Sequence, residues 1–178
     1  MMFPRLGWWQ RLRHGRGFGV HSPSAYRFIR EVLREECAYY AYPEVDALAA
    51  SWPGGARKAR MLLRIVAAMR PHSVAVGASD MAARIVRLGG SGAVISAAVL
   101  PDTDFVVMAD STICAADAFA AAARGATVVM PDRSMHEAAA LLARLSGEMA
   151  HGHIYLDGGR TAIFVGNNAP FQTFAVRF

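Results

Sequence analysis

The chain has 178 residues, of which 54% are hydrophobic and 19% charged, and its formal net charge is +5 at pH 7. This length predicts one domain, or one domain preceded by an arm, and the apolar content excludes an intrinsically disordered chain. No apolar run is long enough for a transmembrane helix and no secretory leader is recognisable, so we expect a cytoplasmic protein with no membrane partner. The two cysteines, Cys37 and Cys114, match no metal motif and suit a reducing compartment.

The first thirty residues are strongly basic. They contain no acidic residue and six arginines: Arg5, Arg11, Arg13, Arg16, Arg27 and Arg30. Such a segment could meet the phosphates of a nucleic acid or an anionic lipid surface, and transit peptides have a similar composition. Because glycine, histidine and proline interrupt the basic residues, we favour a solvated segment that folds onto its own domain. No recognised nucleic-acid module occurs, so we do not expect a nucleic acid as partner.

The N-terminal third predicts an arm and two helices. Several glycines and Pro23 disfavour regular structure over residues 1–23, which predicts an irregular arm there. Residues 24–36 and 56–70 each place apolar side chains on one helical face. In the second helix the expected solvent face carries Arg57, Lys58, Arg60 and Arg64. We place the boundary between an N-terminal arm and helix (1–55) and the main domain (56–178) in the loop over residues 51–55.

From residue 73 onward, short apolar runs alternate with helical patterns. Strands are predicted at 73–76, 93–97, 105–108 and 127–130, and helices at 80–88, 115–124 and 134–147, the last opened by a capping box at Ser134. A hairpin at 153–156 and 161–165 and a strand at 171–178 follow. This order predicts an α/β fold: a Rossmann-like, mostly parallel sheet with helices on both faces and an antiparallel C-terminal edge. Ligands bind beyond the carboxyl ends of such strands.

Several segments carry a family resemblance. One is His14-Gly15-Arg16-Gly17-Phe18-Gly19-Val20-His21-Ser22-Pro23, followed later by Tyr39-Tyr40-Ala41-Tyr42. It resembles the leader of a bacterial group of class I S-adenosylmethionine-dependent methyltransferase-like proteins, in which a G-V-H-S-P segment and a tyrosine-rich segment precede the nucleotide-binding domain. Residues 74–79, 104–110, 125–132 and 171–178 resemble the first, fourth, fifth and last strands of that fold. The resemblance implies methyl transfer from S-adenosylmethionine to an unknown small acceptor.

The sequence departs from this family at the cofactor site. Ala75 stands where the family has an acid before its glycine turn, and Gly77 alone remains of the glycine pair. The second strand ends in Ser96-Ala97-Ala98, with no carboxylate before Asp102. The stretch from Ala98 to Asp104 is too short for the usual helix, strand and helix, so one sheet edge is expected to be missing. A non-catalytic scaffold or partner-binding protein is therefore the alternative function, with the free edge covered by the arm or by a second subunit of a homo-oligomer.

The resemblance implies particular site residues, and the residues themselves leave alternatives open. Gly77, Ser79, Asp80 and Ala98 would contact the cofactor, and His21, folded over the pocket mouth with Ser22 and Pro23, or Asp110 would be the catalytic base. Alternatively, residues 77–80 form a plain strand-to-helix turn in which Ser79 or Asp80 caps the helix. Asp110 and Asp132 could together hold a divalent cation, but no third ligand is in view, so we expect no metal site.

Overall fold

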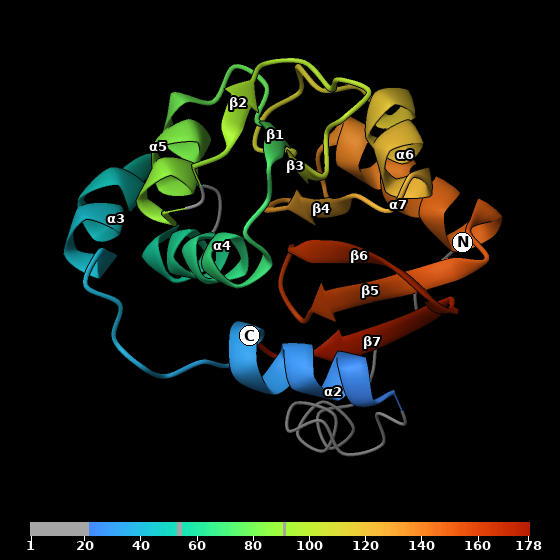
Figure 1. The fold of residues 1–178 in the computed structure, drawn as a ribbon, viewed down its shortest axis with the longest axis horizontal. Helices are drawn as coiled ribbons and strands as arrows, with labels where there is room; N and C mark the ends of the chain where they lie inside the picture. Colours follow the sequence, from blue (N-terminus) through green and yellow to red (C-terminus); the bar gives the residue numbers. More distant parts are fainter. Residues whose placement is uncertain (1–21, 53–54, 91) are drawn as a thin grey trace.

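A computed structural model describes residues 22–52, 55–90 and 92–178. Their secondary structure is mixed: seven strands form one sheet, in the order β2-β1-β3-β4-β6-β5-β7, and helices lie on both of its faces (Figure 1). Among the described helices, none combines the length and the apolar composition that a membrane crossing requires. The predicted fold class is confirmed as an α/β sheet, mostly parallel, with an antiparallel C-terminal edge.

Four parallel strands form the first half of the sheet. They are β1 (Ser73–Ala75), β2 (Val94–Ser96), β3 (Phe105–Val107) and β4 (Thr127–Met130). β1 lies between β2 and β3, and β4 follows β3, all in parallel register. β1, β3 and β4 are buried throughout, whereas β2 is the outermost strand of the described sheet and leaves Val94 68% exposed. Strands covered on both faces read as continuous apolar runs, which is why these short segments were recognisable.

The second half of the sheet comes from the end of the chain. β5 (His151–Asp157) and β6 (Ala162–Pro170) form the predicted hairpin, and β7 (Gln172–Val176) pairs with β5 in parallel. The last strand of this hairpin, β6, lies between β4 and β5 and is antiparallel to both. The C-terminal segment therefore joins the parallel strands through one antiparallel strand.

Two apolar cores lie on opposite faces of the sheet. Successive residues of β3 and β4 alternate between them, with Val107 and Val129 on one side and Val106 and Val128 on the other. The first core packs against α4 (Gly55–Met69), α5 (Asp80–Leu88) and the N-terminal helices. The second packs against α6 (Ala115–Ala123) and α7 (His136–Glu148). Helices therefore cover both faces, as predicted.

The N-terminal region is more helical than the sequence indicated. The predicted helix over 24–36 is an α-helix, α2 (Pro23–Phe28), that continues as a π-helix, η1 (Ile29–Leu33). The tyrosine-rich stretch, which was not predicted to be helical, begins α3 (Tyr42–Leu48), and a 3₁₀ turn, η2 (Ala49–Ser51), follows. Pro43 stands near the start of α3, where a missing N–H costs nothing. Buried side chains before and after the loop over residues 51–55, where the boundary was expected, belong to one apolar core.

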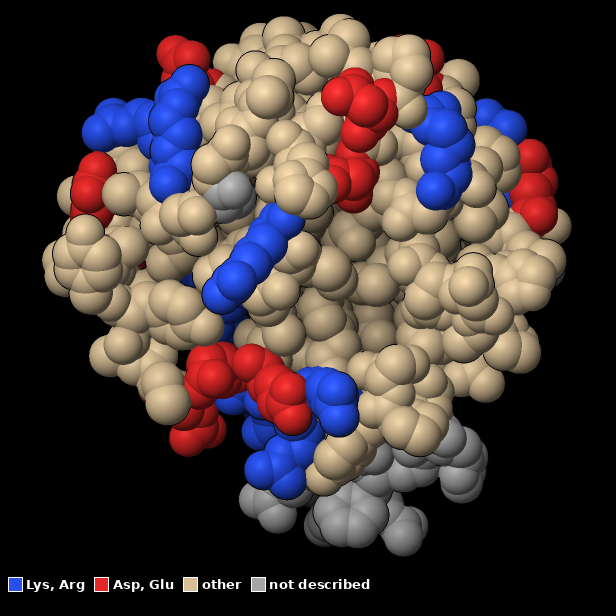
Figure 2. Space-filling model, in the orientation of Figure 1, with Lys and Arg blue, Asp and Glu red and all other residues tan. Residues whose placement is uncertain are grey.

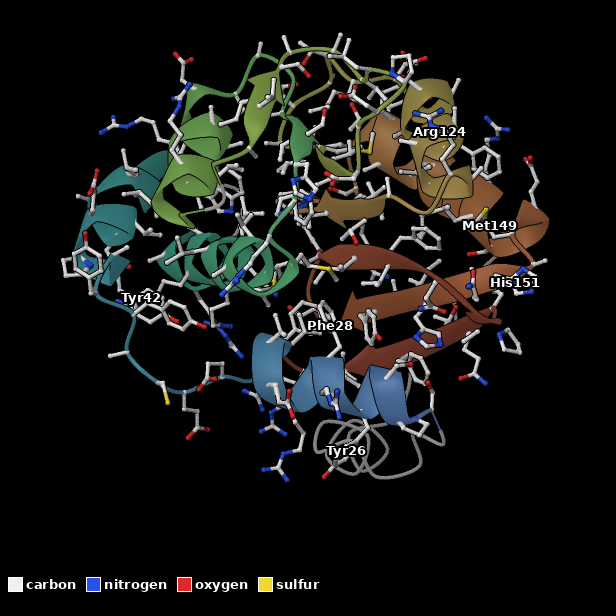
Figure 3. All side chains as sticks on the ribbon, in the orientation of Figure 1. Tyr26, Phe28, Tyr42, Arg124, Met149 and His151 are labelled. Atoms are coloured by element: carbon white, nitrogen blue, oxygen red, sulfur yellow. The ribbon has the colours of Figure 1, made fainter. Side chains whose placement is uncertain are left out.

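Aromatic rings attach the N-terminal helices to the rest of the fold. Phe28 of α2 reaches the strands, where its ring lies 4.9 Å from that of Tyr155, centroid to centroid (Figure 3). Tyr42 of α3 lies under the Arg60 guanidinium of α4, with 4.8 Å between the guanidinium carbon and the ring centroid. These contacts place α2 beside β5 and β7, at the end of the sheet away from β2 (Figure 1).

Two expectations for the helices are wrong. Lys58 and Arg64 do not face solvent, since they are 8% and 9% exposed. The capping box at Ser134 does not form either: Met135 is the N-cap of α7, and the Ser134 hydroxyl donates to Asp132 at 2.6 Å. The Glu137 carboxylate, which would complete the box, instead accepts from the N–H of Ala115 at the start of α6, at 2.6 Å. In place of the capping box, Glu137 thus bonds a distant backbone group and Ser134 bonds its own turn.

A glycine in β5 allows a sharp irregularity in the hairpin. The register with β6 shifts between His151 and His153, and Gly152 has φ of +110° at that point. A Cβ at Gly152 would lie 2.6 Å from the Phe164 ring and 3.2 Å from the Val165 carbonyl oxygen. Glycine is therefore required by backbone conformation and by space together.

We expect Gly152→Ala to lower the free energy of unfolding by about 2 kcal/mol or more, because strain at positive φ alone costs about 1–3 kcal/mol. Denaturant unfolding followed by circular dichroism measures the change. Gly158→Ala is the matched control, since its Cβ would meet nothing within 4 Å, and its effect should stay near about 0.5 kcal/mol. Equal effects of the two substitutions would contradict this account of the bulge.

Candidate functional site

An open pocket of about 290 Å³ lies beyond the carboxyl ends of β1, β2 and β3. The loop after each of these strands, together with the start of α6, lines it: Gly77, Ala78, Ala97, Ala98, Val99, Thr112, Ile113 and Asp117. Parallel strands present their carboxyl ends at one edge, so three loops that are distant in sequence meet there. Gly77 and Ala98, two of the expected cofactor residues, therefore line the same pocket.

The glycine turn after β1 is filled by side chains of the protein itself. Gly77 has φ of +66°, and a Cβ there would lie 2.6 Å from Asp110 Oδ1 and closer still to Thr112 Oγ1. The next N–H, that of Ala78, donates to Thr112 Oγ1 at 3.0 Å. This backbone donor, which a phosphate or ribose ligand could use, already has its partner. The turn is therefore closed by the loop that follows β3.

Ser79 and Asp80 serve the helix that follows. The Ser79 hydroxyl accepts from the Ala82 N–H at 3.2 Å and caps α5. Asp80 occupies the first turn, where a carboxylate interacts favourably with the helix dipole, and it is exposed. Neither residue lines the pocket. This is the plain turn-and-cap arrangement that the sequence left open as the alternative.

Asp110 is held within its own loop. Its Oδ1 accepts from the N–H of Thr112 at 2.9 Å and from the Thr112 hydroxyl. Asp132, at the end of β4, repeats the pattern: its Oδ1 accepts from the Ser134 N–H at 2.9 Å and from the Ser134 hydroxyl. Partial burial works against ionisation of Asp132, but the bonds from Ser134 and Arg160 outweigh it and lower its pKa. Both carboxylates thus stabilise turns after strands.

The remaining expected site groups do not gather at the pocket. In the described part of the chain, no three His, Cys, Asp or Glu side chains come together to hold a metal ion. His21 lies outside the described residues. Ser22 and Pro23, which the resemblance places over the pocket mouth, instead begin α2, beside β5 and β7. Asp102, the first carboxylate after β2, is exposed and does not line the pocket.

The two pocket residues with polar side chains were missed in the sequence. Thr112 follows Asp110 by two positions, and this Asp-x-Thr spacing is typical of a side-chain-closed turn, which was a usable signal. Asp117 lies in the first turn of α6 and brings the pocket a carboxylate, the one acidic group among its lining residues. Its position depends on how α6 packs beside the β2 loop, so no local motif could have assigned it.

No model of a known protein family matches the chain, and neither a curated protein nor a solved structure is significantly similar to it.

A second polar cluster lies inside the hairpin, around His153. This side chain is 1% exposed, and its Nδ1 lies 3.2 Å from Asn167 Nδ2 and 3.4 Å from the Tyr155 hydroxyl. Asn167 Oδ1 accepts from the Ala169 N–H at 2.8 Å, which orients the amide so that Nδ2 donates to His153. The ring proton therefore sits on Nε2, which is buried and has no hydrogen-bond partner among the described residues.

Burial lowers the pKa of His153 below its ordinary value of 6.5. In the unfolded chain this histidine takes up a proton as the pH falls through about 6.5, whereas in the folded chain it stays neutral to lower pH. The unfolded state then binds more protons than the folded state. The stability contribution of neutral His153 is thus complete above the unfolded pKa and is lost as the pH falls.

We expect His153→Gln to reduce the loss of unfolding free energy between about pH 7.5 and pH 5, because it removes this titration. Urea unfolding at each pH measures the difference. His151→Gln, at an exposed position of the same strand, should keep the wild-type pH profile. If His153→Gln also keeps that profile, the folded histidine titrates normally and the assignment is wrong.

Proposed function

We propose that this chain is a non-catalytic relative of the class I S-adenosylmethionine-dependent methyltransferases, a protein of that fold that works by binding a partner rather than by methyl transfer. The observation that carries the proposal is the closed glycine turn, in which Thr112 and Asp110 fill the space facing Gly77 and Thr112 takes the Ala78 N–H. A protein that binds a partner and catalyses no reaction does not need an open cofactor turn at Gly77.

The strand order supports the choice of fold family. Three features accompany the sequence resemblance: a parallel set, an antiparallel strand between β4 and β5, and ligand-facing loops after β1, β2 and β3. The antiparallel strand next to the last parallel one is the feature that a plain doubly wound sheet lacks. β2 lies at the outer edge of the described sheet, where the family would have a further strand.

The cytoplasmic location of the protein stays a prediction.

The residues present do not fit S-adenosylmethionine in this conformation. The loop after β2 offers Ala97, Ala98 and Val99 where a ribose would need a hydrogen-bond acceptor. The pocket volume, about 290 Å³, is just below the range of about 300–1,000 Å³ for sites that enclose drug-sized ligands. A cofactor would also have to displace Thr112 from Ala78.

Methyl transfer to a small acceptor is the second candidate, and one observation favours it. Gly77 and Ala98 meet at the carboxyl ends of neighbouring strands, where the resemblance places the cofactor, and Asp117 brings a carboxylate to the same pocket. For this function the loop over residues 110–112 would have to open. Asp110 would then lose its bonds to Thr112 and become available as a base.

A thermal-shift titration with S-adenosylhomocysteine separates the two candidates, because a ligand that binds only the folded state raises the melting temperature. We expect no shift at about 1 mM ligand, since every charge-assisted bond missing at the ribose weakens binding by roughly 1.5–3 kcal/mol. A clear shift at micromolar ligand would establish cofactor binding and favour the enzyme.

The variants for this test follow from the pocket geometry. Gly77→Leu is unsuitable, since a side chain there would collide with Asp110 and strain the turn even without ligand. Ala98→Phe is better, because Ala98 is exposed and lines the pocket. It should abolish any shift seen in the wild type, whereas Ala139→Phe, at an exposed position on α7, should not. A shift that survives Ala98→Phe would place the ligand elsewhere.

A further inference from the structure

A second cavity, of about 620 Å³, lies where α4, the end of η1 and the C-terminal end of β7 meet. Five arginines line it: Arg34, Arg57, Arg60, Arg64 and Arg177. We call it the arginine pocket. Figure 2 shows basic side chains over α4 and the end of η1, with acidic ones beside them; other charged side chains are scattered over the upper part of the same face. It lies apart from the loops after β1, β2 and β3, so it does not depend on the proposed function.

The innermost arginine of this pocket has only neutral partners in the described hydrogen bonds. Arg64 is 9% exposed, and it donates to the carbonyl oxygens of Val32 at 2.9 Å and Leu33 at 3.0 Å and to the Tyr42 hydroxyl at 3.1 Å. These bonds fix the guanidinium and use three of its five N–H groups. They do not cancel its charge, which therefore contributes a positive potential to the cavity beside it.

Two outer arginines are available to a ligand. Arg57 and Arg177 are exposed, and the described residues give neither of them an ion-pair partner. They come from segments 120 positions apart in the chain, the first turn of α4 and the residue after β7. Two arginines that line one cavity from separate elements are suited to a doubly charged oxyanion.

The acidic residues nearby do not neutralise the pocket. Asp46 pairs with Arg60, with 2.6 Å between Arg60 Nε and Asp46 Oδ1. Glu35 and Glu36 line the cavity, and Glu35 accepts from the N–H of Cys37 at 2.9 Å, which lowers its pKa. Five arginines line the cavity against two acidic side chains, Glu35 and Glu36.

The start of α4 adds to this potential. Its first turn carries no acidic residue, and Ala56 and Arg57 of that turn line the cavity. The unpaired N–H groups at a helix N-terminus carry partial positive charge and favour an anion beside them. The helix dipole and the arginines therefore act in the same direction.

We propose that the arginine pocket binds a small molecule that carries a phosphate or pyrophosphate group, with Arg57 and Arg177 contacting the anion and Arg64 supplying fixed charge behind it. The cavity volume, about 620 Å³, lies inside the range of about 300–1,000 Å³ for small-molecule sites, which leaves room for an organic part beside the anion. Glu35 and Glu36 lie at the same cavity and favour a ligand whose remaining part is neutral or cationic.

Isothermal titration of the full chain with pyrophosphate, at constant ionic strength, tests this proposal. We expect saturable one-to-one binding, weakened at least about tenfold in the double variant Arg57→Gln, Arg177→Gln, because charge-assisted hydrogen bonds are lost. Both side chains are exposed, so the variant should fold, which circular dichroism verifies. The matched control is Arg84→Gln, Arg87→Gln, which removes two exposed arginines from α5 and should leave the affinity unchanged.

Three results would overturn the proposal. One is the absence of binding by the wild type at about 10 mM pyrophosphate in low salt, a concentration at which even millimolar affinity is visible. Another is an equal loss in the two double variants, which would indicate diffuse charge attraction. The third is a single-stranded oligonucleotide that binds far more tightly than pyrophosphate and depends on Arg57 and Arg177, which would assign the surface to nucleic acid.

Discussion

Helix α4 buries two cations, and the partners of each come from a different end of the chain. Lys58 pairs with Asp157 at the end of β5 and lies 4.6 Å from the centroid of the Phe178 ring. Arg64 donates hydrogen bonds to the carbonyl oxygens of Val32 and Leu33 at the end of η1. Removing one partner of a buried ion pair typically costs about 3–5 kcal/mol, because the remaining charge stays desolvated. The N-terminal helices and the C-terminal strands thereby both contact one helix, in addition to the pairing of β6 with β4.

Burial opposes the charge of Lys58 and lowers its pKa, while Asp157 raises it and thereby favours the ammonium form. Such a pair contributes less to net stability than its geometry suggests, since desolvation offsets much of the attraction. Its contribution is to specificity: a β5 register that moved Asp157 away would leave an ammonium group buried and unpaired. The register of the C-terminal strands and the position of α4 thus depend on each other.

The strands were predictable from the sequence because their signal is local. Val128 and Val129 lie in a continuous apolar run, and a sheet with helices on both faces needs such runs. The burial of Lys58 and Arg64 was not predictable in this way, since the side chains and carbonyls that stabilise them lie about thirty to a hundred positions away. The same holds for Glu137, whose carboxylate accepts from the distant Ala115 N–H in place of completing the expected capping box. Charged side chains on an amphipathic helix indicate solvent unless such distant partners exist.

The candidate site was predictable in outline only. Because ligand loops follow the carboxyl ends of parallel strands, the strand pattern alone predicts that Gly77 and Ala98 lie together, and both line one pocket. The strand pattern predicts where a pocket lies, but it does not predict which side chains fill or line that pocket. Whether the glycine turn is open depends on the conformation of residues 110–112, where an Asp carboxylate can bond to its own loop or face a ligand. The Asp110-x-Thr112 spacing signals that the carboxylate can close its own turn. That Thr112 also accepts from the Ala78 N–H depends on packing between two loops, which no local pattern reveals.

The outermost strand has a consequence for how the chain behaves at high concentration. β2 has a hydrogen-bonded neighbour on one side only within the described sheet, and Val94 is largely exposed on it. A row of unpaired backbone groups is a template on which a strand from another molecule can add. With three residues, β2 offers such a strand very few hydrogen bonds, too few to offset the entropy of ordering it. The short length of β2 thus disfavours edge-to-edge pairing into a fibre. An insertion that lengthened β2 would remove that protection.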